Sequence, residues 1–365
     1  MPTPSAFGEL TVPKPPSEPV SALAFYRDAS SERAAQMLVA SWDKTVQLHD
    51  LSRCGEGPSG VAVLQTFEHP AAVLDVCWIN ESLAASACLD RRVRLLNLAN
   101  GQAVILGKHD NGVCRIQYDA HTELLFSGSW DKTIKVWDPA AAPDAALQHT
   151  LALPDKVFAM DCVPLYRGAP TVSVKDATPR LVVAMAGRAV HVYNLEQLRD
   201  AIHAKATDAI APENSRESSL KYMLRDVRCM PDGLGYATSS VEGRIAVEFF
   251  DPSPESQAQK YAFKCHRKEV DGEDVVFPIH AIAFSPAYGT FATGGGDSHC
   301  ALWDPVAKKR IRQYVLPSPV SALAFSADGH LLAIASGAEN LEEGAAPAPV
   351  QILIKPAVDD AKVRC

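Results

Sequence analysis

Apolar and polar residues alternate in short segments along most of the chain, a pattern typical of β-strands with one buried face. Gly, Pro, Asp and Asn separate these segments and predict tight turns. Seven of the segments are similar to one another: PVSALAF from Pro19, AVLDVCW from Ala72, VCRIQY from Val113, VFAMDCV from Val157, LRDVRC from Leu224, IHAIAF from Ile279 and PVSALAF from Pro319. The pattern predicts an all-β chain made of repeated groups of strands.

A second stretch recurs after each of these segments and consists of a small residue, an Asp turn and an alternating strand that often ends in Trp-Asp. The clear copies are ASWDKTVQLHD from Ala40, CLDRRVRLLNL from Cys88, GSWDKTIKVWD from Gly128 and GGGDSHCALWD from Gly294. Weaker copies are AGRAVHVYNL from Ala186, VEGRIAVEFFD from Val241 and HLLAIASGAEN from His330. Asp43, Asp90 and Asp131 are separated by 47 and 41 positions, which is the period of WD40 repeats.

Seven such repeats predict a seven-bladed WD40 β-propeller in which each blade is a four-stranded sheet. We expect the FGELTV segment near the N-terminus to pair with the last blade and close the ring, because closure removes free sheet edges. Residues 5–356 then form one propeller, with short tails at 1–4 and 357–365.

Three stretches interrupt the repeat, at residues 165–180, 195–215 and 340–350. In the second, the spacing of Leu195, Leu198 and Ile202 predicts a short helix. The composition of the third, which contains NLEEGAAPAPV, indicates a flexible loop.

Composition limits the classes of function. The chain has 365 residues, 47% of them hydrophobic, so a large core is available, and its net charge of −8 argues against direct, general nucleic-acid binding. No apolar run has the length of a membrane span, and the nine cysteines lie mostly in apolar strands, which indicates reduced thiols in the cytosol or nucleus. We expect no cofactor and no bound metal.

Two tryptophans, Trp42 and Trp130, stand directly before the Asp of the repeat turn. Strands a to d of a blade run from axis to rim in alternating directions, so the b–c turns and the d–a loops share one side, here called the top. The same position holds Gly296 in another repeat, so the turn itself does not require Trp. Each Trp therefore either packs on a neighbouring loop or serves as an aromatic anchor for a partner.

The innermost strand of each blade, strand a, begins on the top side. Among the seven residues that occupy this first position, Arg225 is charged and the others are uncharged. The set is Ser21, Leu74, Cys114, Phe158, Arg225, His280 and Ser321. Arg225 either forms an internal salt bridge, to Asp226 or Glu242, or remains free to bind an anion.

A basic cluster is predicted on the fifth blade. Arg244 belongs to the b–c turn Glu242-Gly243-Arg244, and the segment KYAFKCHR runs toward the top with Lys264 and Arg267. We expect these residues to form one cluster with Arg225. Such a cluster suits phosphate or carboxylate. The alternative is a solvated basic edge that nearby Glu residues balance.

Two patterns resemble catalytic or metal sites. His109, Ser129 and Asp131 could be a Ser-His-Asp site, but together with Trp137 they are better interpreted as a structural hydrogen-bonded set, because no nucleophile elbow surrounds the Ser. The Cys265-His266 pair has no second pair at ligand spacing, so we expect His266 in the equivalent set of its own blade. The sequence thus predicts a protein that is not an enzyme.

The fifth-blade region carries a specific resemblance. RESSLKYMLRDVR from Arg216, SSVEGRIAVEFFDPSPE from Ser239 and KYAFKCHR from Lys260 closely resemble the spindle-assembly-checkpoint WD40 family, which partners the checkpoint kinase Bub. GSWDKTIKVWDP, AGRAVHVYNL and TFATGGGDSHCALWDPVAKKR extend the likeness over nearly the whole chain. The sister family, the messenger-RNA export propeller that binds a nucleoporin, shares EGR and FKCHR.

The resemblance implies a non-enzymatic scaffold, monomeric within hetero-complexes, that acts in the nucleus, at the kinetochore and also in the cytoplasm. Such propellers bind GLEBS segments of the checkpoint kinase and its pseudokinase-like relative across the top face, where Trp42, Trp130 and Arg225 match the contacting positions. The complex also recognises phosphorylated Met-Glu-Leu-Thr repeats of a kinetochore scaffold, and Arg244 and Lys264 match the positions that hold the phosphothreonine. The alternative is a nuclear-pore and mRNA-export adaptor that binds a nucleoporin GLEBS segment.

Overall fold

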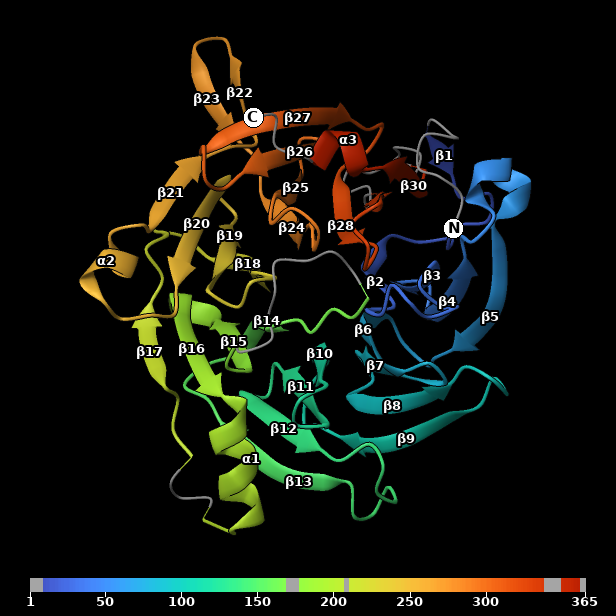
Figure 1. The fold of residues 1–365 in the computed structure, drawn as a ribbon, viewed down its shortest axis with the longest axis vertical. Coiled ribbons are helices and arrows are strands. Elements are labelled where there is room, and N and C mark those ends of the chain that lie inside the picture. Colours follow the sequence, from blue (N-terminus) through green and yellow to red (C-terminus); the bar gives the residue numbers. More distant parts are fainter. Residues whose placement is uncertain (1–8, 169–176, 207–209, 338–348, 362–365) are drawn as a thin grey trace.

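Seven four-stranded antiparallel sheets stand around a central axis in the computed structural model, which describes residues 9–168, 177–206, 210–337 and 349–361 (Figure 1). The predicted seven-bladed β-propeller is confirmed. Residues 340–348 of the loop predicted at 340–350, the middle of the 165–180 stretch and the tail at 1–4 lie outside the described residues.

Blades one to four follow one another in chain order, each from axis to rim. The first blade contains β2 (Val20–Phe25), β3 (Gln36–Ser41), β4 (Thr45–Asp50) and β5 (Ala62–Glu68). The second contains β6 (Val73–Asn80), β7 (Leu83–Cys88), β8 (Arg92–Asn97) and β9 (Ala103–Lys108). The third contains β10 (Val113–Asp119), β11 (Leu124–Ser129), β12 (Thr133–Trp137) and β13 (Leu147–Ala152), and the fourth β14 (Val157–Cys162), β15 (Arg180–Met185), β16 (Ala189–Asn194) and β17 (Asn214–Glu217).

The last three blades continue the same order. The fifth contains β18 (Leu224–Cys229), β19 (Gly235–Ser240), β20 (Arg244–Phe249) and β21 (Tyr261–Lys264), and the sixth β24 (Ile279–Phe284), β25 (Phe291–Gly295), β26 (His299–Asp304) and β27 (Lys309–Val315). The seventh contains β28 (Val320–Phe325), β29 (Leu331–Ser336), β30 (Gln351–Pro356) and, from the other end of the chain, β1 (Leu10–Thr11). The seven similar segments of the sequence form the innermost strands of the seven blades.

The N-terminal strand closes the ring, as predicted. In β1, Leu10 lies opposite Ile354 and Thr11 opposite Leu353 of β30, and the backbone N–H of Val12 donates to the carbonyl of Ile352. Leu10 is buried with residues of the first and seventh blades. Closure therefore joins the two ends of the described chain through both hydrogen bonds and core packing.

The described chain also contains short helices outside the seven sheets. The predicted helix is α1 (Leu195–His203), where Leu195 and Leu198 are buried and the side chain of Asn194 accepts a hydrogen bond from the Gln197 N–H as a cap. The other helices are α2 (Pro254–Gln257) and α3 (Val358–Ala361), and single 3-10 turns lie at η2 (Cys54–Glu56), η3 (Pro58–Gly60) and η4 (Ala186–Arg188). Helix α3 packs on the sixth and seventh blades, where Ala361 is buried.

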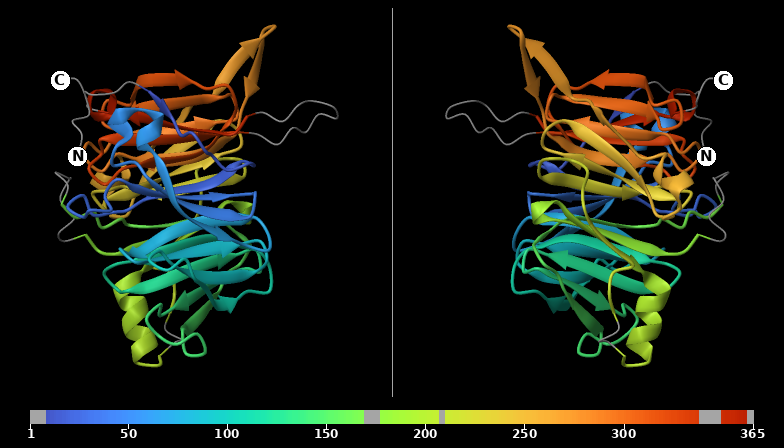
Figure 2. Two further views of the ribbon diagram at one scale, coloured as in Figure 1. Left: turned by 90° about the vertical axis from the view of Figure 1, so that its right-hand side faces the viewer. Right: turned by 90° about the vertical axis from the view of Figure 1, so that its left-hand side faces the viewer.

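A two-stranded hairpin between the fifth and sixth blades was not predicted. It consists of β22 (Arg267–Val270) and β23 (Glu273–Val276), and Figure 2 shows it extending beyond the ring at the end of the molecule opposite α1. Asp271 and Gly272 form its turn with φ of 53° and 82°. Asp-Gly is the residue pair that favours such a turn, so the signal was present in the sequence.

The structural hydrogen-bonded set of the third blade contains Ser127, and the assignment of Ser129 to it was wrong. His109 Nδ1 lies 2.9 Å from Asp131 Oδ2 and His109 Nε2 lies 2.8 Å from Ser127 Oγ, which also accepts the Trp137 indole N–H at 2.8 Å. Ser129 Oγ instead donates to the Gly112 carbonyl.

The sixth blade has the corresponding set, as predicted for His266. Its Nδ1 lies 2.8 Å from Asp297 Oδ1 and its Nε2 lies 2.8 Å from Thr293 Oγ1, which also accepts the Trp303 indole N–H. Both sets join the loop that leaves one blade to the strands of the next blade. His109 and His266 therefore have a structural role.

Candidate functional site

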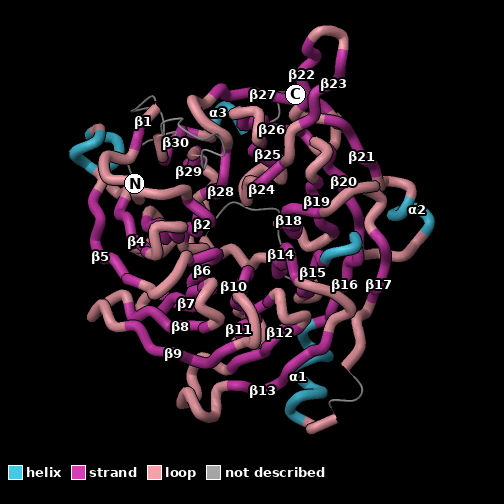
Figure 3. The backbone as a smooth tube through the Cα atoms, turned by 180° about the vertical axis from the view of Figure 1, so that it is seen from behind, coloured by secondary structure: helices cyan, strands magenta, loops and turns pink. Residues whose placement is uncertain are grey.

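The seven innermost strands begin around a pocket of about 680 Å³ at the top end of the central channel. Figure 3 looks onto this side of the ring. Every residue of the strand-a set contributes to the pocket lining: Ser21, Leu74, Cys114, Phe158, Arg225, His280 and Ser321. The comparison of equivalent repeat positions therefore identified the lining of a real concavity.

Trp42 and Trp130 both lie on the wall of this pocket, in the b–c turns of the first and third blades. Trp42 is 38% exposed. Trp130 is half-buried, packs on the core between the third and fourth blades, and covers Gly112 so closely that a Cβ there would come within 3.1 Å of its ring. The packing interpretation thus holds in part for Trp130, whereas Trp42 remains an open aromatic surface.

The Asp of each turn has a structural role. Asp43 Oδ1 accepts hydrogen bonds from the Thr45 N–H and hydroxyl, and Lys44 between them adopts a left-handed backbone with φ of 71°. This arrangement holds the turn without any help from the preceding side chain. The turn therefore does not depend on the Trp42 side chain for its conformation.

Arg225 forms no salt bridge to Asp226 or Glu242, so that interpretation was wrong. Asp226 Oδ2 accepts the Ile282 N–H of the next blade and pairs with Arg228, and Glu242 pairs with Arg244. Within the described chain, the side chain of Arg225 contacts one polar partner, His280, with 3.2 Å between Nη2 and Nδ1. Arg225 is exposed at the pocket mouth, but desolvation by the surrounding pocket wall, followed by repulsion from Arg115, lowers its pKa.

Arg115 is a pocket residue that the sequence comparison missed. It follows Cys114 on the innermost strand of the third blade, one position after the aligned set. Its Nη1 donates to the carbonyl of Cys114, and its buried Nε has no hydrogen-bond partner among the described residues. The pocket therefore contains two arginines, and each lacks a carboxylate partner within the described chain.

Arg244 and Lys264 lie directly opposite each other on the paired strands β20 and β21 of the fifth blade. Cross-strand partners share a face, so the two cations stand side by side. Lys264 is exposed, and Arg244 is 35% exposed, 3.4 Å from Glu242. Neither residue lines the central pocket, so the structure separates two basic positions, Arg225 on the pocket and the Arg244–Lys264 pair beside it.

Arg267 does not extend this basic pair. Its Nη1 donates to Asp274 of the hairpin at 2.7 Å, and its Nη2 donates to the carbonyl of Glu242. Its role is to attach the hairpin to the b–c turn of the fifth blade.

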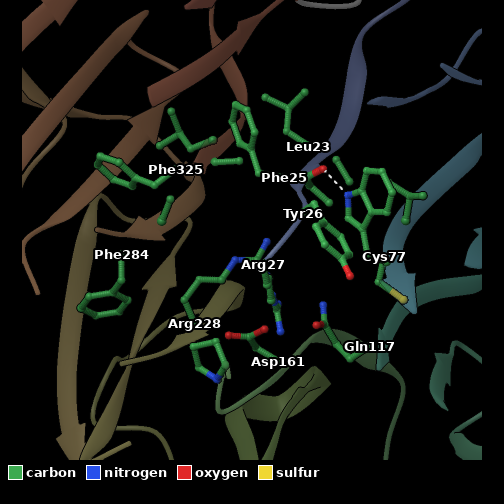
Figure 4. A pocket seen from close by; sticks show the side chains of 18 of the residues that line it. Leu23, Phe25, Tyr26, Arg27, Cys77, Gln117, Asp161, Arg228, Phe284 and Phe325 are labelled. Atoms are coloured by element: carbon green, nitrogen blue, oxygen red, sulfur yellow. Dashed lines mark hydrogen bonds between the residues drawn. The ribbon is translucent and has the colours of Figure 1, made fainter. Parts of the chain in front are cut away.

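A smaller cavity of about 120 Å³ lies further along the channel, where the side chains of Arg27, Arg228, Asp161 and Gln117 converge (Figure 4). Asp161 Oδ2 accepts the Cys229 N–H, and Arg228 Nε donates to the carbonyl of Ile282, so each side chain joins its own blade to the next. Burial raises the pKa of Asp161 despite these arginines. Asp75 also lines this cavity, so two arginines face two aspartates, which indicates that the cavity braces the blades.

Neither a metal cluster nor a membrane helix is found within the described part of the chain. Its residues contain no group of three or more His, Cys, Asp or Glu placed to hold a metal ion. None of its helices is both long and apolar enough to cross a membrane.

Comparison with known proteins identifies the repeat and the relatives. The model for "WD domain, G-beta repeat" matches residues 102–138 and 260–304. The solved structure titled "Structure of U3-55K" superposes with a TM-score of 0.71 over 96% of this chain and 98% of that one, at 16% identity, which supports the fold alone.

Relatives over the full length are mitotic checkpoint proteins and RNA-export proteins. The chain is 42% identical to the Arabidopsis thaliana "Mitotic checkpoint protein BUB3.1" over 99% of this chain and 96% of the relative. It is 36% identical to the Dictyostelium discoideum "Mitotic checkpoint protein bub3" over 93% and 91%. The Schizosaccharomyces pombe "Poly(A)+ RNA export protein" is 31% identical over 90% and 83%.

None of these names denotes an enzyme, and the checkpoint proteins have the higher identities. The WD40 repeats, the closed seven-bladed ring and the full-length match agree with one another. The chain therefore belongs to the Bub3 family of mitotic checkpoint WD40 propellers.

Proposed function

We propose that this chain is a non-enzymatic scaffold of the spindle assembly checkpoint whose top-face pocket binds GLEBS segments of the checkpoint kinase and its pseudokinase-like relative. The observation that carries the proposal is the pocket itself, in which Trp42, Trp130 and Arg225 lie around one 680 Å³ concavity and Arg225 has no carboxylate partner within the described residues. Full-length identity to mitotic checkpoint proteins supports the same role.

A short acidic segment that binds in the pocket can contact both an apolar surface and a positive charge. Trp42 is a rigid aromatic surface of the kind found at binding hot spots. Arg225 is held by His280 rather than by an acid, so a partner carboxylate can form a charge-assisted hydrogen bond with it. Each such contact contributes about 2 kcal/mol when it is desolvated at the centre of an interface.

The second part of the proposal concerns phosphothreonine in Met-Glu-Leu-Thr repeats of a kinetochore scaffold. Arg244 and Lys264 stand side by side on neighbouring strands, which places two cations where a single phosphate can meet both. A phosphate with a charge between −1.5 and −2 at neutral pH suits this pair. Localisation at kinetochores, in the nucleus and in the cytoplasm then follows from the partners.

Calorimetric titration tests both sites in sequence. A GLEBS segment is titrated first, and the loaded protein is then titrated with a Met-Glu-Leu-Thr peptide, phosphorylated or not. We expect tighter binding of the phosphorylated form and loss of that preference in Arg244→Glu. Equal affinity for the two forms would overturn the phosphothreonine site, and failure to bind the GLEBS segment would overturn the pocket assignment.

An mRNA-export adaptor is the second candidate function. Relatives named "Poly(A)+ RNA export protein" and "mRNA export factor GLE2" are 31% and 28% identical to the chain. A competition between kinase and nucleoporin GLEBS segments distinguishes the two candidates: we expect the kinase segment to displace the nucleoporin segment, and the reverse preference favours the export role.

A further inference from the structure

The second blade holds a pair of cations in the same strand register as the Arg244–Lys264 pair of the fifth blade. Arg92, the first residue of β8, lies opposite Lys108, the last residue of β9. In the fifth blade, Arg244 begins β20 and lies opposite Lys264, which ends β21. Both pairs therefore lie at the top of a blade beside its b–c turn. Figure 1 shows β8 and β9 on the opposite side of the ring from β20 and β21.

The surroundings of the two pairs also correspond. Arg92 Nη1 lies 3.4 Å from the carboxylate of Asp90, two positions earlier in the turn. Arg244 Nε lies 3.4 Å from the carboxylate of Glu242, again two positions earlier. In both turns the residue between acid and arginine has a left-handed backbone, with φ of 73° and 65°, and its carbonyl accepts the N–H of the residue after the lysine, at 2.8 and 2.9 Å. The two pairs therefore present their side chains at the same height and on the same face of a blade.

The repeat itself does not require two cations at these positions. In the first, third, fourth and sixth blades the residues paired in this register are Thr45–Glu68, Thr133–Ala152, Ala189–Glu217 and His299–Val315. Two of these pairs contain a glutamate, and none contains two of Lys and Arg. The cation pair of the second blade is therefore not a consequence of the fold, which indicates a binding role.

The acid beside this pair is already engaged. Both oxygens of Asp90 accept hydrogen bonds from Arg94, at 3.0 and 2.5 Å. Burial alone would raise the pKa of Asp90, but the hydrogen bonds from Arg94 hold it well below its usual value. Arg92 is 45% exposed, and the exposed Lys108 forms neither an ion pair nor a side-chain hydrogen bond within the described residues. Both cations are therefore available to an anion.

A third cation reaches this pair from the next blade. Lys135 of β12 donates from Nζ to the backbone carbonyl of Lys108 at 2.7 Å, and no carboxylate of the described residues pairs with it. The equivalent position beside Lys264 is Ala301 of β26, which has no charge. The second blade therefore gathers three cations where the fifth blade has two.

We propose that Arg92, Lys108 and Lys135 form a second phosphate site, which binds another phosphorylated residue of the partner chain whose first phosphothreonine binds the Arg244–Lys264 pair. A phosphate with a charge of about −1.5 to −2 at neutral pH suits three adjacent cations. The inference rests on the proposed function, because phosphorylated repeats of one scaffold supply both phosphates.

The second site acts through tethering. Exposed cations bind an isolated phosphate weakly, because water and salt screen the charges. A phosphate held on an already bound chain meets the site at a high effective concentration, so it raises the affinity of the whole chain. A singly phosphorylated peptide therefore depends on the Arg244–Lys264 pair alone, and the second site distinguishes partners that carry several phosphates.

The test uses two peptides that begin with a phosphorylated Met-Glu-Leu-Thr repeat and end, after a Gly-Ser linker, in a second Thr. A linker of about 40 residues has a root-mean-square length of about 35 Å, and a chain of this size has an expected radius of gyration of about 21 Å, so the linker can cross the ring. The second Thr is phosphorylated in one peptide and unmodified in the other.

Fluorescence anisotropy measures both peptides with the full chain loaded with a GLEBS segment, as the wild type, Arg92→Glu and Lys156→Glu. Lys156 is an exposed lysine in the loop between β13 and β14, on the same top side of the ring, so its replacement matches the charge change at Arg92.

We expect the second phosphate to tighten binding to the wild type by about fivefold or more, which exceeds the gain of about twofold that two phosphates competing for one site give by statistics. Arg92→Glu abolishes this gain and binds the singly phosphorylated peptide as the wild type does, which also shows that the variant is folded. Lys156→Glu keeps the gain.

Equal affinity of the two peptides for the wild type overturns the second site and leaves the Arg244–Lys264 site standing. A gain that both variants lose means general charge attraction and overturns the second site, as does a gain that both variants keep. If neither peptide binds the wild type, the phosphothreonine site of the fifth blade is overturned together with the second site.

Discussion

Arg225 Nη2 lies 3.2 Å from His280 Nδ1, which joins the innermost strands of the fifth and sixth blades at the mouth of the top pocket. Burial, followed by the positive charge of Arg225, lowers the pKa of His280 to about 4. The ring is therefore neutral near pH 7, and Nδ1 accepts the hydrogen bond from the guanidinium. The contact orients Arg225 without neutralising it, which leaves the charge for a partner carboxylate.

Replacement of Arg225 tests this arrangement. Arg225→Ala should weaken binding of a GLEBS segment by about 2 kcal/mol, or about thirtyfold, because a desolvated carboxylate loses its charge-assisted hydrogen bond. His280→Gln, which keeps an acceptor beside the guanidinium, should cost much less. Isothermal titration calorimetry measures both, and affinity of Arg225→Ala within twofold of the wild type would contradict the assignment.

The stability of the propeller should depend on pH through buried histidines. Burial lowers the pKa of His49 and of His69 to about 4 each. In the unfolded chain these histidines have pKa values of about 6.5, so they are protonated at a higher pH than in the folded chain. Falling pH therefore favours the unfolded state: the full stability is present above about pH 6.5 and is lost as the pH falls toward 4. His280 has the same shift, so between pH 7.5 and 5.5 the three histidines should together lower the free energy of unfolding by about 4 kcal/mol.

Urea unfolding at the two pH values measures this loss. His49→Gln should reduce the difference by about a third, because it removes one of the three histidines whose pKa is lowered to about 4. A free energy of unfolding that is the same at pH 7.5 and 5.5 in the wild type would rule out neutral burial of these rings.

Ser127 and Ser129 should differ in their effect on stability. Ser127→Ala leaves the Trp137 N–H and His109 Nε2 without a partner and should lower the free energy of unfolding by about 2–3 kcal/mol. Ser129→Ala loses one hydrogen bond to a backbone carbonyl and should cost about 1 kcal/mol. Chemical denaturation compares the two variants, and a larger effect of Ser129→Ala would contradict the hydrogen-bond assignment.

Lys264 should limit the affinity for phosphothreonine. Arginine presents a planar fork to phosphate whereas lysine presents a point charge, so Lys264→Arg should tighten binding by about 1 kcal/mol, or fivefold, and Lys264→Glu should abolish it. Titration of the phosphorylated Met-Glu-Leu-Thr peptide measures both variants. Unchanged affinity in Lys264→Glu would remove this residue from the site.

The sequence predicted the parts of the fold that repeat. Strand alternation and the recurring Asp turn were sufficient to find all seven innermost strands, and comparing equivalent positions placed Trp42, Trp130 and Arg225 on one pocket. These predictions succeed because a repeat position fixes both the height of a residue in its blade and the face on which it lies.

Relationships between blades could not be predicted in the same way. Ser127 and Ser129 share one face of β11, so alternation alone does not decide which of them is level with His109. The neighbour of Arg225 is His280 of the next blade, and its position depends on the offset between two sheets that do not share hydrogen-bonded strands. Arg267 likewise depends on a hairpin whose Asp-Gly signal lies outside the repeat.

The central claim is that the charge of Arg225 meets an acidic residue of a bound segment. The most direct measurement is a charge exchange, in which Arg225→Glu is titrated with the GLEBS segment and with variants of it that carry Lys in place of each Glu in turn. We predict that Arg225→Glu loses the original segment and regains affinity for one Lys variant that the wild type binds weakly. Binding of the original segment to Arg225→Glu with unchanged affinity would contradict the claim.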